Sequence, residues 1–196
     1  MTLKKITMLT LLSLLLACAQ RPEQELEDTR RALDEARAAE AAVYAPEEFE
    51  AAEEALRQAE REIETQDDRF ALRRSYDRAS ELLSQARTAA QEAVSAAAAN
   101  KENVSKQAQE AIGEAEEVVE TAADALTRAP RGKGTAADLE AMQSSLEASR
   151  ESLSQARQHF EEERFLDALN EAKSAAERAG TITRDIEEAI RRTGRR

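Results

Sequence analysis

The sequence predicts an all-α protein in which antiparallel helical hairpins form an elongated, alanine-rich bundle or coiled coil. Apolar residues recur in steps of three and four, which is the spacing of one helix face. Alanine, the strongest helix former, fills many of these positions. The 196 residues include only 5 glycines and 3 prolines, and aromatic residues make up 3% of the chain, which argues against a β-sheet protein.

The first predicted element is a secretory signal at residues 1–17. Lys4 and Lys5 form a short basic region, and the apolar run 6–16 follows it directly. This run has about eleven residues, whereas a helix needs about 20 to cross a bilayer. The combination is typical of a signal peptide that is removed after export.

The signal ends in Leu15-Leu16-Ala17-Cys18, which resembles the lipobox of bacterial lipoproteins. The resemblance implies cleavage between Ala17 and Cys18, and attachment of a diacylglyceryl group to the Cys18 thiol. Cys18 is the only cysteine, so no disulfide is expected. An ordinary cleavage site with a chance cysteine beside it is the alternative. Ala19 stands where an aspartate would resemble an inner-membrane retention signal, which favours the outer membrane with the protein body in the periplasm; the cell surface is the alternative location.

Residues 18–45 are predicted to form the lipidated N-terminus and a helical stalk that leads away from the lipid. Leu26, Leu33 and Ala36 give this stretch only a weak apolar pattern. Tyr44-Ala45-Pro46 then indicates a helix end and a new start, because proline suits the first position of a helix.

Residues 46–129 are predicted to form the first hairpin, with an extended second helix. Asp67 and Asp68 are expected to cap a helix that begins at Phe70. A shift in apolar phase around residues 100–105 predicts a kink or short break. The predicted buried stripes are Phe49, Ala52, Leu56, Ala59 and Ile63, then Tyr76, Ala79, Leu83, Ala86, Ala90, Ala93 and Ala97, then Val104, Ala108, Ile112, Ala115, Val119, Ala122 and Leu126.

Residues 130–134 are predicted to be a linker, and residues 135–196 the second hairpin. Thr135 and Asp138 resemble a capping box. Several apolar positions repeat those of the first hairpin at an offset of 90 or 89 residues, which indicates an internal repeat. The predicted stripes are Leu139, Met142, Leu146, Ser149, Leu153, Ala156 and Phe160, then Phe165, Ala168, Ala172, Ala175, Ala179, Ile182, Ile186 and Ala189.

The run 38–56 is similar to the DUF4398 family of bacterial envelope lipoproteins. It consists of a small-residue helix, then Tyr44-Ala45-Pro46, acidic residues and the pattern Ala52-X3-Leu56-X2-Ala59. The resemblance extends over about residues 30–99. It implies a location in the envelope and a helical shape, because the family has no characterised activity.

Few residues suggest chemistry, and we expect no catalytic residue, cofactor or metal. His159 and Glu163 are spaced for a two-ligand metal clip, but a surface histidine is the ordinary interpretation. Acidic runs such as 47–50 and 161–163 are expected to be solvated helix faces paired with arginines. A net charge of −12, which becomes −14 without residues 1–17, argues against nucleic-acid binding.

The function expected is that of a non-enzymatic, lipid-anchored spacer, adaptor or scaffold. Its partners would be the membrane and either another envelope protein or peptidoglycan. The alternative is a peptide- or protein-binding module of tetratricopeptide type, although the 34-residue period of that repeat is missing. An enzyme is not expected. The basic residues 191–196 suit the negative end of the last helix, or would contact anionic lipid or cell-wall polymer.

Overall fold

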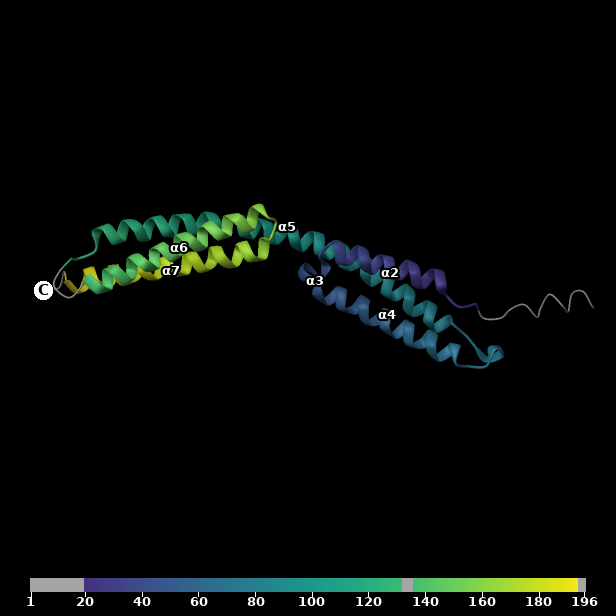
Figure 1. The fold of residues 1–196 in the computed structure, drawn as a ribbon. Helices are drawn as coiled ribbons and strands as arrows, with labels where there is room; N and C mark the ends of the chain where they lie inside the picture. Colours follow the sequence, from purple (N-terminus) through teal and green to yellow (C-terminus); the bar gives the residue numbers. More distant parts are fainter. Residues whose placement is uncertain (1–19, 132–135, 194–196) are drawn as a thin grey trace, which may run out of the picture. The chain divides into compact units, whose positions relative to one another are not determined.

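The computed structural model describes residues 20–131 and 136–193, which contain helices and no β-strand. This confirms the prediction of an all-α bundle. The elements are α2 (Glu23–Ala38), α3 (Ala41–Tyr44), α4 (Pro46–Asp67), the 3-10 turn η2 (Ala71–Arg73), α5 (Asp77–Arg128), α6 (Ala136–Glu161) and α7 (Phe165–Thr193) (Figure 1). The predicted capping residue Thr135 and the linker residues 132–134 lie outside the described residues.

The chain divides into two compact units, whose boundary lies between Asn100 and Lys101. Unit 1 contains α2, α3, α4 and the first part of α5, and unit 2 contains the rest of α5 with α6 and α7. The sequence had placed the boundary in the linker 130–134 instead. Helix α5 also continues through residues 100–105, so the short break that was one of the two predicted alternatives there is wrong. The phase shift changes which face of α5 is buried, because each part of the helix packs within a different unit.

The core of unit 1 is formed by three helical segments that share an alanine-rich seam. Every residue of the predicted stripe from Tyr76 to Ala97 is buried, and of the stripe on α4 only Leu56 remains partly exposed. The buried seam alanines with no exposed surface are Ala36, Ala41, Ala52, Ala59, Ala79, Ala86, Ala90, Ala93 and Ala97.

Helix α2 belongs to this core and is not a separate stalk. Leu26 packs in one cluster with residues of α4 and α5, and Leu33 is buried as well. The hydroxyl of Thr29 is buried and donates to the backbone oxygen of Leu83 at 3.2 Å, which links α2 to α5. The sequence pattern of α2 is weak because the polar Thr29 occupies a position on the buried face.

The connections within unit 1 follow from local backbone preferences. Pro46 opens α4 as predicted, and Glu47 and Glu48 lie in its first turn, where the helix dipole favours acidic side chains. Glu40 has a φ of 59°, a left-handed conformation that turns the chain between α2 and α3. The amide of Asn100 donates to the backbone oxygen of Tyr44 at 2.7 Å and holds the end of α3 against α5.

The connection between α4 and α5 differs from the prediction. No helix begins at Phe70: Asp68 ends α4, a single 3-10 turn follows, and α5 begins at Asp77. The second helix of this pair therefore begins seven residues later than predicted, at Asp77 instead of Phe70.

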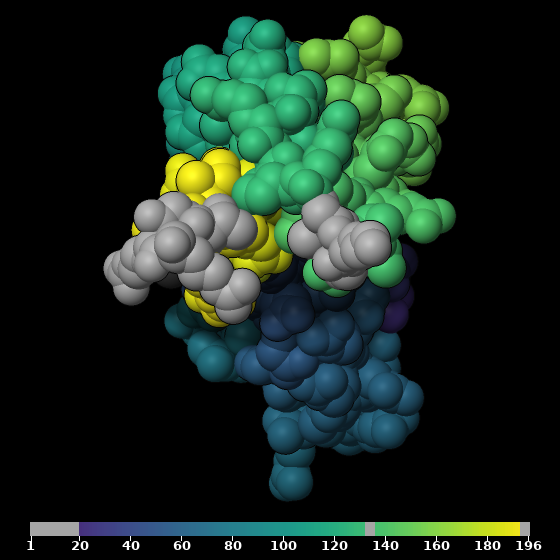
Figure 2. Space-filling view, turned by 90° about the vertical axis from the view of Figure 1, so that its left-hand side faces the viewer, coloured from purple at the N-terminus to yellow at the C-terminus, as the bar shows by residue number. Residues whose placement is uncertain are grey.

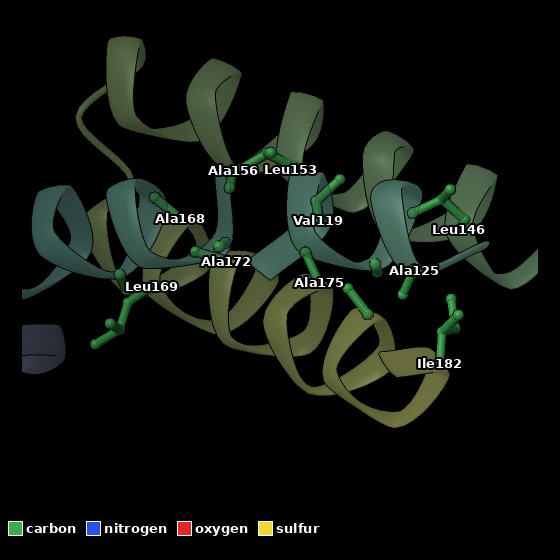
Figure 3. Packing of buried hydrophobic residues seen from close by; sticks show 14 of the residues in the cluster. Val119, Ala125, Leu146, Leu153, Ala156, Ala168, Leu169, Ala172, Ala175 and Ile182 are labelled. Carbon is green, nitrogen blue, oxygen red and sulfur yellow. The ribbon is translucent and has the colours of Figure 1, made fainter. Parts of the chain in front are cut away.

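Unit 2 has the same construction, with α6 and α7 joined by a short turn at residues 162–164. Its core combines alanines of all three helical segments with a few larger side chains, including Val119, Leu146, Leu153 and Ile182 (Figure 3). In the space-filling view of Figure 2, the end of α5 and the helices α6 and α7 lie against one another. Arg178 of α7 donates to the backbone oxygen of Ala148 in α6 at 3.0 Å.

Because of the alanine seam, we expect the effect of a larger side chain on the stability of the fold to depend strongly on its position in α5. Ala90 has no exposed surface, whereas Ala98 on the same helix is exposed. We expect Ala90→Leu to lower the free energy of unfolding by about 1–3 kcal/mol, because the seam has no room for an isobutyl group. Ala98→Leu should change it by less than about 0.5 kcal/mol. Urea denaturation followed by circular dichroism measures both; equal stability of the two variants would contradict close packing at Ala90.

Candidate functional site

The predicted lipid-attachment and cleavage residues, Ala17 and Cys18, lie outside the described residues. The structure describes the chain from Gln20, and Arg21 is the first charged residue of the described part. Arg21 forms ion pairs with Glu23 and, at 3.1 Å, with Asp67 at the end of α4. The start of α2 and the α4–α5 connection therefore lie at the same end of unit 1 (Figure 1).

The α4–α5 loop, defined as residues 68–76, is held by buried and half-buried polar contacts. Gln66 is buried, and its side-chain oxygen accepts hydrogen bonds from the Ser75 backbone N–H at 3.1 Å and from the Arg69 side chain at 3.3 Å. The Arg74 guanidinium donates to the backbone oxygens of Asp67 and Arg69 at 2.6 and 2.9 Å. These bonds fix both ends of the loop to the last turn of α4.

Tyr76 is the last residue of the same loop and anchors it to the core. Its ring packs in the core of unit 1, and its hydroxyl donates to Asp67 at 2.5 Å. The hydrogen bond to Asp67, together with burial and the negative charge of that carboxylate, raises the pKa of Tyr76. Asp67 thus joins Tyr76 and Arg21, which connects the loop to the start of α2.

The outer surface of this loop is apolar and basic. Phe70 and Leu72 have relative exposures of 71% and 83%. Arg69 and Arg73 beside them are exposed, and within the described residues neither forms an ion pair. The large hydrophobic residues exposed among the described residues are Val43, Phe70, Leu72 and Ile190.

Sequence reasoning missed this surface because Phe70 was taken as the start of a helix, whereas the structure places it in the loop. One signal that could have revealed it is the string Arg69-Phe-Ala-Leu-Arg-Arg74, in which two large apolar residues alternate with small or basic ones outside any helical stripe. Phe70 also lies outside the buried stripe that leads into α5, because that stripe begins at Tyr76.

The two residues considered as a metal clip are engaged by different partners. His159 Nδ1 accepts a hydrogen bond from Arg164 Nε at 3.1 Å, whereas Glu163 pairs with Lys101 at 3.4 Å. Glu163 has a φ of 58° and forms part of the turn between α6 and α7. Across residues 20–131 and 136–193, no cluster of three or more potential metal ligands is found.

The acidic runs lie mostly on exposed helix faces. Hydrogen bonds from Gln58, Arg57 and Arg61 lower the pKa of Glu54 to about 2. The other described carboxyl groups with a shifted pKa are Glu102 and Glu162, and both are lowered. A general acid needs a raised carboxyl pKa, so these groups are suited to ion pairing rather than proton donation at neutral pH.

An open groove of about 540 Å³ runs between α6 and α7. Met142 and Ile182 supply apolar surface, and Asp138, Asp185 and Arg178 supply charge. Of the predicted basic terminus, Arg191 and Arg192 lie in the last turns of α7, with Arg192 paired to Glu188, and residues 194–196 lie outside the described part of the chain.

No protein-family model, curated protein or solved structure matches the chain. The resemblance of residues 38–56 to DUF4398 therefore remains a prediction from the residues themselves. None of the helices in the described part of the chain combines the length and apolar character needed to span a bilayer.

Because the Gln66 amide is buried and holds the loop, its removal should lower both the stability of the fold and the protease resistance of the loop. We expect Gln66→Ala to lower the free energy of unfolding by about 1–2 kcal/mol, because the Ser75 N–H loses its acceptor. It should also speed tryptic cleavage after Arg69 and Arg73. The control is Gln58→Ala, which removes an exposed amide on the same helix. Equal stability and equal cleavage rates for the two variants would show that the loop does not depend on Gln66.

The raised pKa of Tyr76 predicts a loss of stability at alkaline pH. The folded state favours the protonated phenol, so its stabilising contribution is complete below the unfolded pKa of about 10 and is lost as pH rises through the higher folded value. The chain has two tyrosines, so Tyr44→Phe leaves Tyr76 as the only tyrosinate signal. Ultraviolet titration of this variant should give a midpoint above 10; a midpoint at the free-tyrosine value with the helices intact would refute the Asp67 hydrogen bond.

Proposed function

We propose that this chain is a lipid-anchored envelope protein of the DUF4398 type that acts without catalysis as a spacer, adaptor or scaffold. The observation that carries the proposal is the order of features at the start of the sequence: a basic pair, an apolar run and then Leu15-Leu16-Ala17-Cys18. These features follow one another as lipidation requires, and the only cysteine stands at the last position. We place the anchor in the outer membrane and the body in the periplasm.

The described helices are consistent with a protein that presents a surface at a set distance from a membrane. The part of α5 in unit 1, residues 77–100, is about 36 Å long at 1.5 Å per residue. Its buried side consists of seam residues, and its exposed side is polar, with Arg78 and Glu81 paired at 2.6 Å. A partner protein or peptidoglycan would contact such exposed helix faces.

The groove between α6 and α7 favours a second candidate function, the binding of a peptide or protein segment. Its mixture of apolar and charged side chains is suited to an extended or helical ligand. A tetratricopeptide-like module would present a groove between hairpins, whereas this groove lies between the two helices of one hairpin, and the chain lacks that repeat's period. The groove and the lipid anchor are compatible, because an anchored adaptor also needs a binding surface.

Lipidation predicts a defined change in the N-terminal peptide. When the full chain is produced in a Gram-negative host, we expect labelled palmitate to be incorporated, and mass spectrometry to show loss of residues 1–17 with a diacylglyceryl group on Cys18. In Cys18→Ser the label should be lost, because serine has no thiol to receive the group.

The matched control is Ser13→Ala, which alters the apolar run but leaves the lipobox unchanged. This variant should incorporate palmitate as the unaltered chain does. Unlabelled protein cut elsewhere, or label that persists in Cys18→Ser, would refute lipidation at Cys18.

A further inference from the structure

The α4–α5 loop places large apolar side chains in water at a position where the fold makes no use of them. Phe70 and Leu72 are the two most exposed large hydrophobic residues described, and they lie within one 3-10 turn and its flanking residue. Single exposed hydrophobic residues are common on protein surfaces, but two in one short loop form a local patch.

This patch is presented by an ordered loop rather than by a loose one. Gln66 and Arg74 hold its two ends through side-chain hydrogen bonds to the backbone. The backbone N–H of Arg73 donates to the oxygen of Phe70 at 2.8 Å, which keeps Phe70, Leu72 and Arg73 on one tight turn. The apolar side chains thus need little further ordering to bind a surface.

The charge beside the patch is positive in a protein of net charge −12. Arg69 and Arg73 flank the apolar residues, whereas Asp68 is the one acidic residue of residues 68–74. The Arg74 guanidinium donates to two backbone oxygens. Arg69 donates one hydrogen bond, to the Gln66 side chain, so its other N–H groups and the exposed Arg73 guanidinium remain for a ligand. A pair of arginines beside exposed apolar side chains matches the boundary between lipid phosphates and acyl chains.

The position of the loop relative to the predicted lipid supplies the second argument. Arg21 pairs with Asp67, the residue just before the loop. Cys18 lies three residues before Arg21, so the two Cα atoms are at most about 11 Å apart along the chain. A lipid on Cys18 therefore keeps the loop close to the bilayer surface.

We propose that the α4–α5 loop is a membrane-docking loop, in which Phe70 and Leu72 enter the boundary between headgroups and acyl chains while Arg69 and Arg73 bind anionic lipid phosphates. The proposal rests on the lipid anchor of the proposed function and adds a second contact that orients unit 1 on the membrane. A lipid surface fits better than a protein partner, because two side chains on a single turn are far smaller than the roughly 800 Å² that each partner buries in a stable protein interface.

The absence of tryptophan from the sequence allows a direct test. Phe70→Trp introduces a single tryptophan, excited selectively at 295 nm, into the full-length processed protein, and Val43→Trp provides a matched control. Val43 is 55% exposed but follows α2, whose 16 residues span about 24 Å away from the loop end. Both proteins are reconstituted into vesicles of phosphatidylethanolamine and phosphatidylglycerol, with and without brominated acyl chains.

We expect the emission of Phe70→Trp to shift to shorter wavelength on vesicles, and brominated lipid to quench it at least about twofold more than Val43→Trp. Replacing Arg69 and Arg73 by glutamine should weaken this quenching, as should replacing phosphatidylglycerol by a neutral lipid. Leu72→Trp serves as the second reporter if Phe70→Trp disturbs the loop. Equal quenching of the loop and control positions would overturn the proposal.

Flotation of the same vesicles separates this result from that of the lipid anchor. Protein that floats while its loop tryptophan remains in water retains the anchor and overturns the docking loop. Protein shown by mass spectrometry to carry no lipid, but whose loop tryptophan is quenched, supports the docking loop and overturns the anchor. Protein without lipid and without quenching overturns both.

Discussion

The close approach of helix backbones along alanine seams is the constraint on which both units depend. In unit 1 and unit 2 alike, the seam positions are mostly alanines without any exposed surface, such as Ala86, Ala97, Ala115 and Ala175. A methyl group buries little apolar area, so each contact stabilises less than a leucine contact would. Dispersion between close-packed backbones supplies part of the difference, and this gain is available only while the side chains remain small. Stability is thus distributed over many weak contacts.

A seam of identical small side chains has little shape to fix how far one helix slides along another. Hydrogen bonds from side chains to the backbone of a neighbouring helix supply this information. Thr29 bonds to the oxygen of Leu83, Asn100 to that of Tyr44, and Arg178 to that of Ala148. Each bond is formed at one longitudinal position of its helix pair, and a shift of one turn would break it. A few polar residues therefore set the register of the helices, and the alanines set how closely the helices approach.

This division explains how much of the fold could be predicted from the sequence. The stripe from Tyr76 to Ala97 was predicted in full, because a regular apolar period reports one buried helix face. Helix α2 was taken for a stalk because its buried face includes the polar Thr29, whose contact with Leu83 of α5 exists only in the folded unit. The short break considered near residues 100–105 was wrong because a change of buried face within α5 has the same periodic signature as a break. The lipobox could be identified from the sequence, but its residues lie outside the described part of the chain. The α4–α5 loop was missed because Phe70 and Leu72 belong neither to a helix stripe nor to the core.

A comparison of the burial of the four phenylalanines shows that Phe70 in the α4–α5 loop is unusual in this protein. Phe49 is buried beneath Arg37, and Phe160 packs against Phe165 with ring centroids 5.2 Å apart, so three of the four contribute to a core. In a protein whose seams consist of alanine, such large side chains are the main source of buried area per residue. Phe70 is the exception, and Leu72 is exposed beside it. A fold with so few large apolar residues gains the most stability from burying each of them. The exposure of Phe70 and Leu72 on an ordered loop flanked by arginines is therefore explained if a lipid surface buries them in place of the fold.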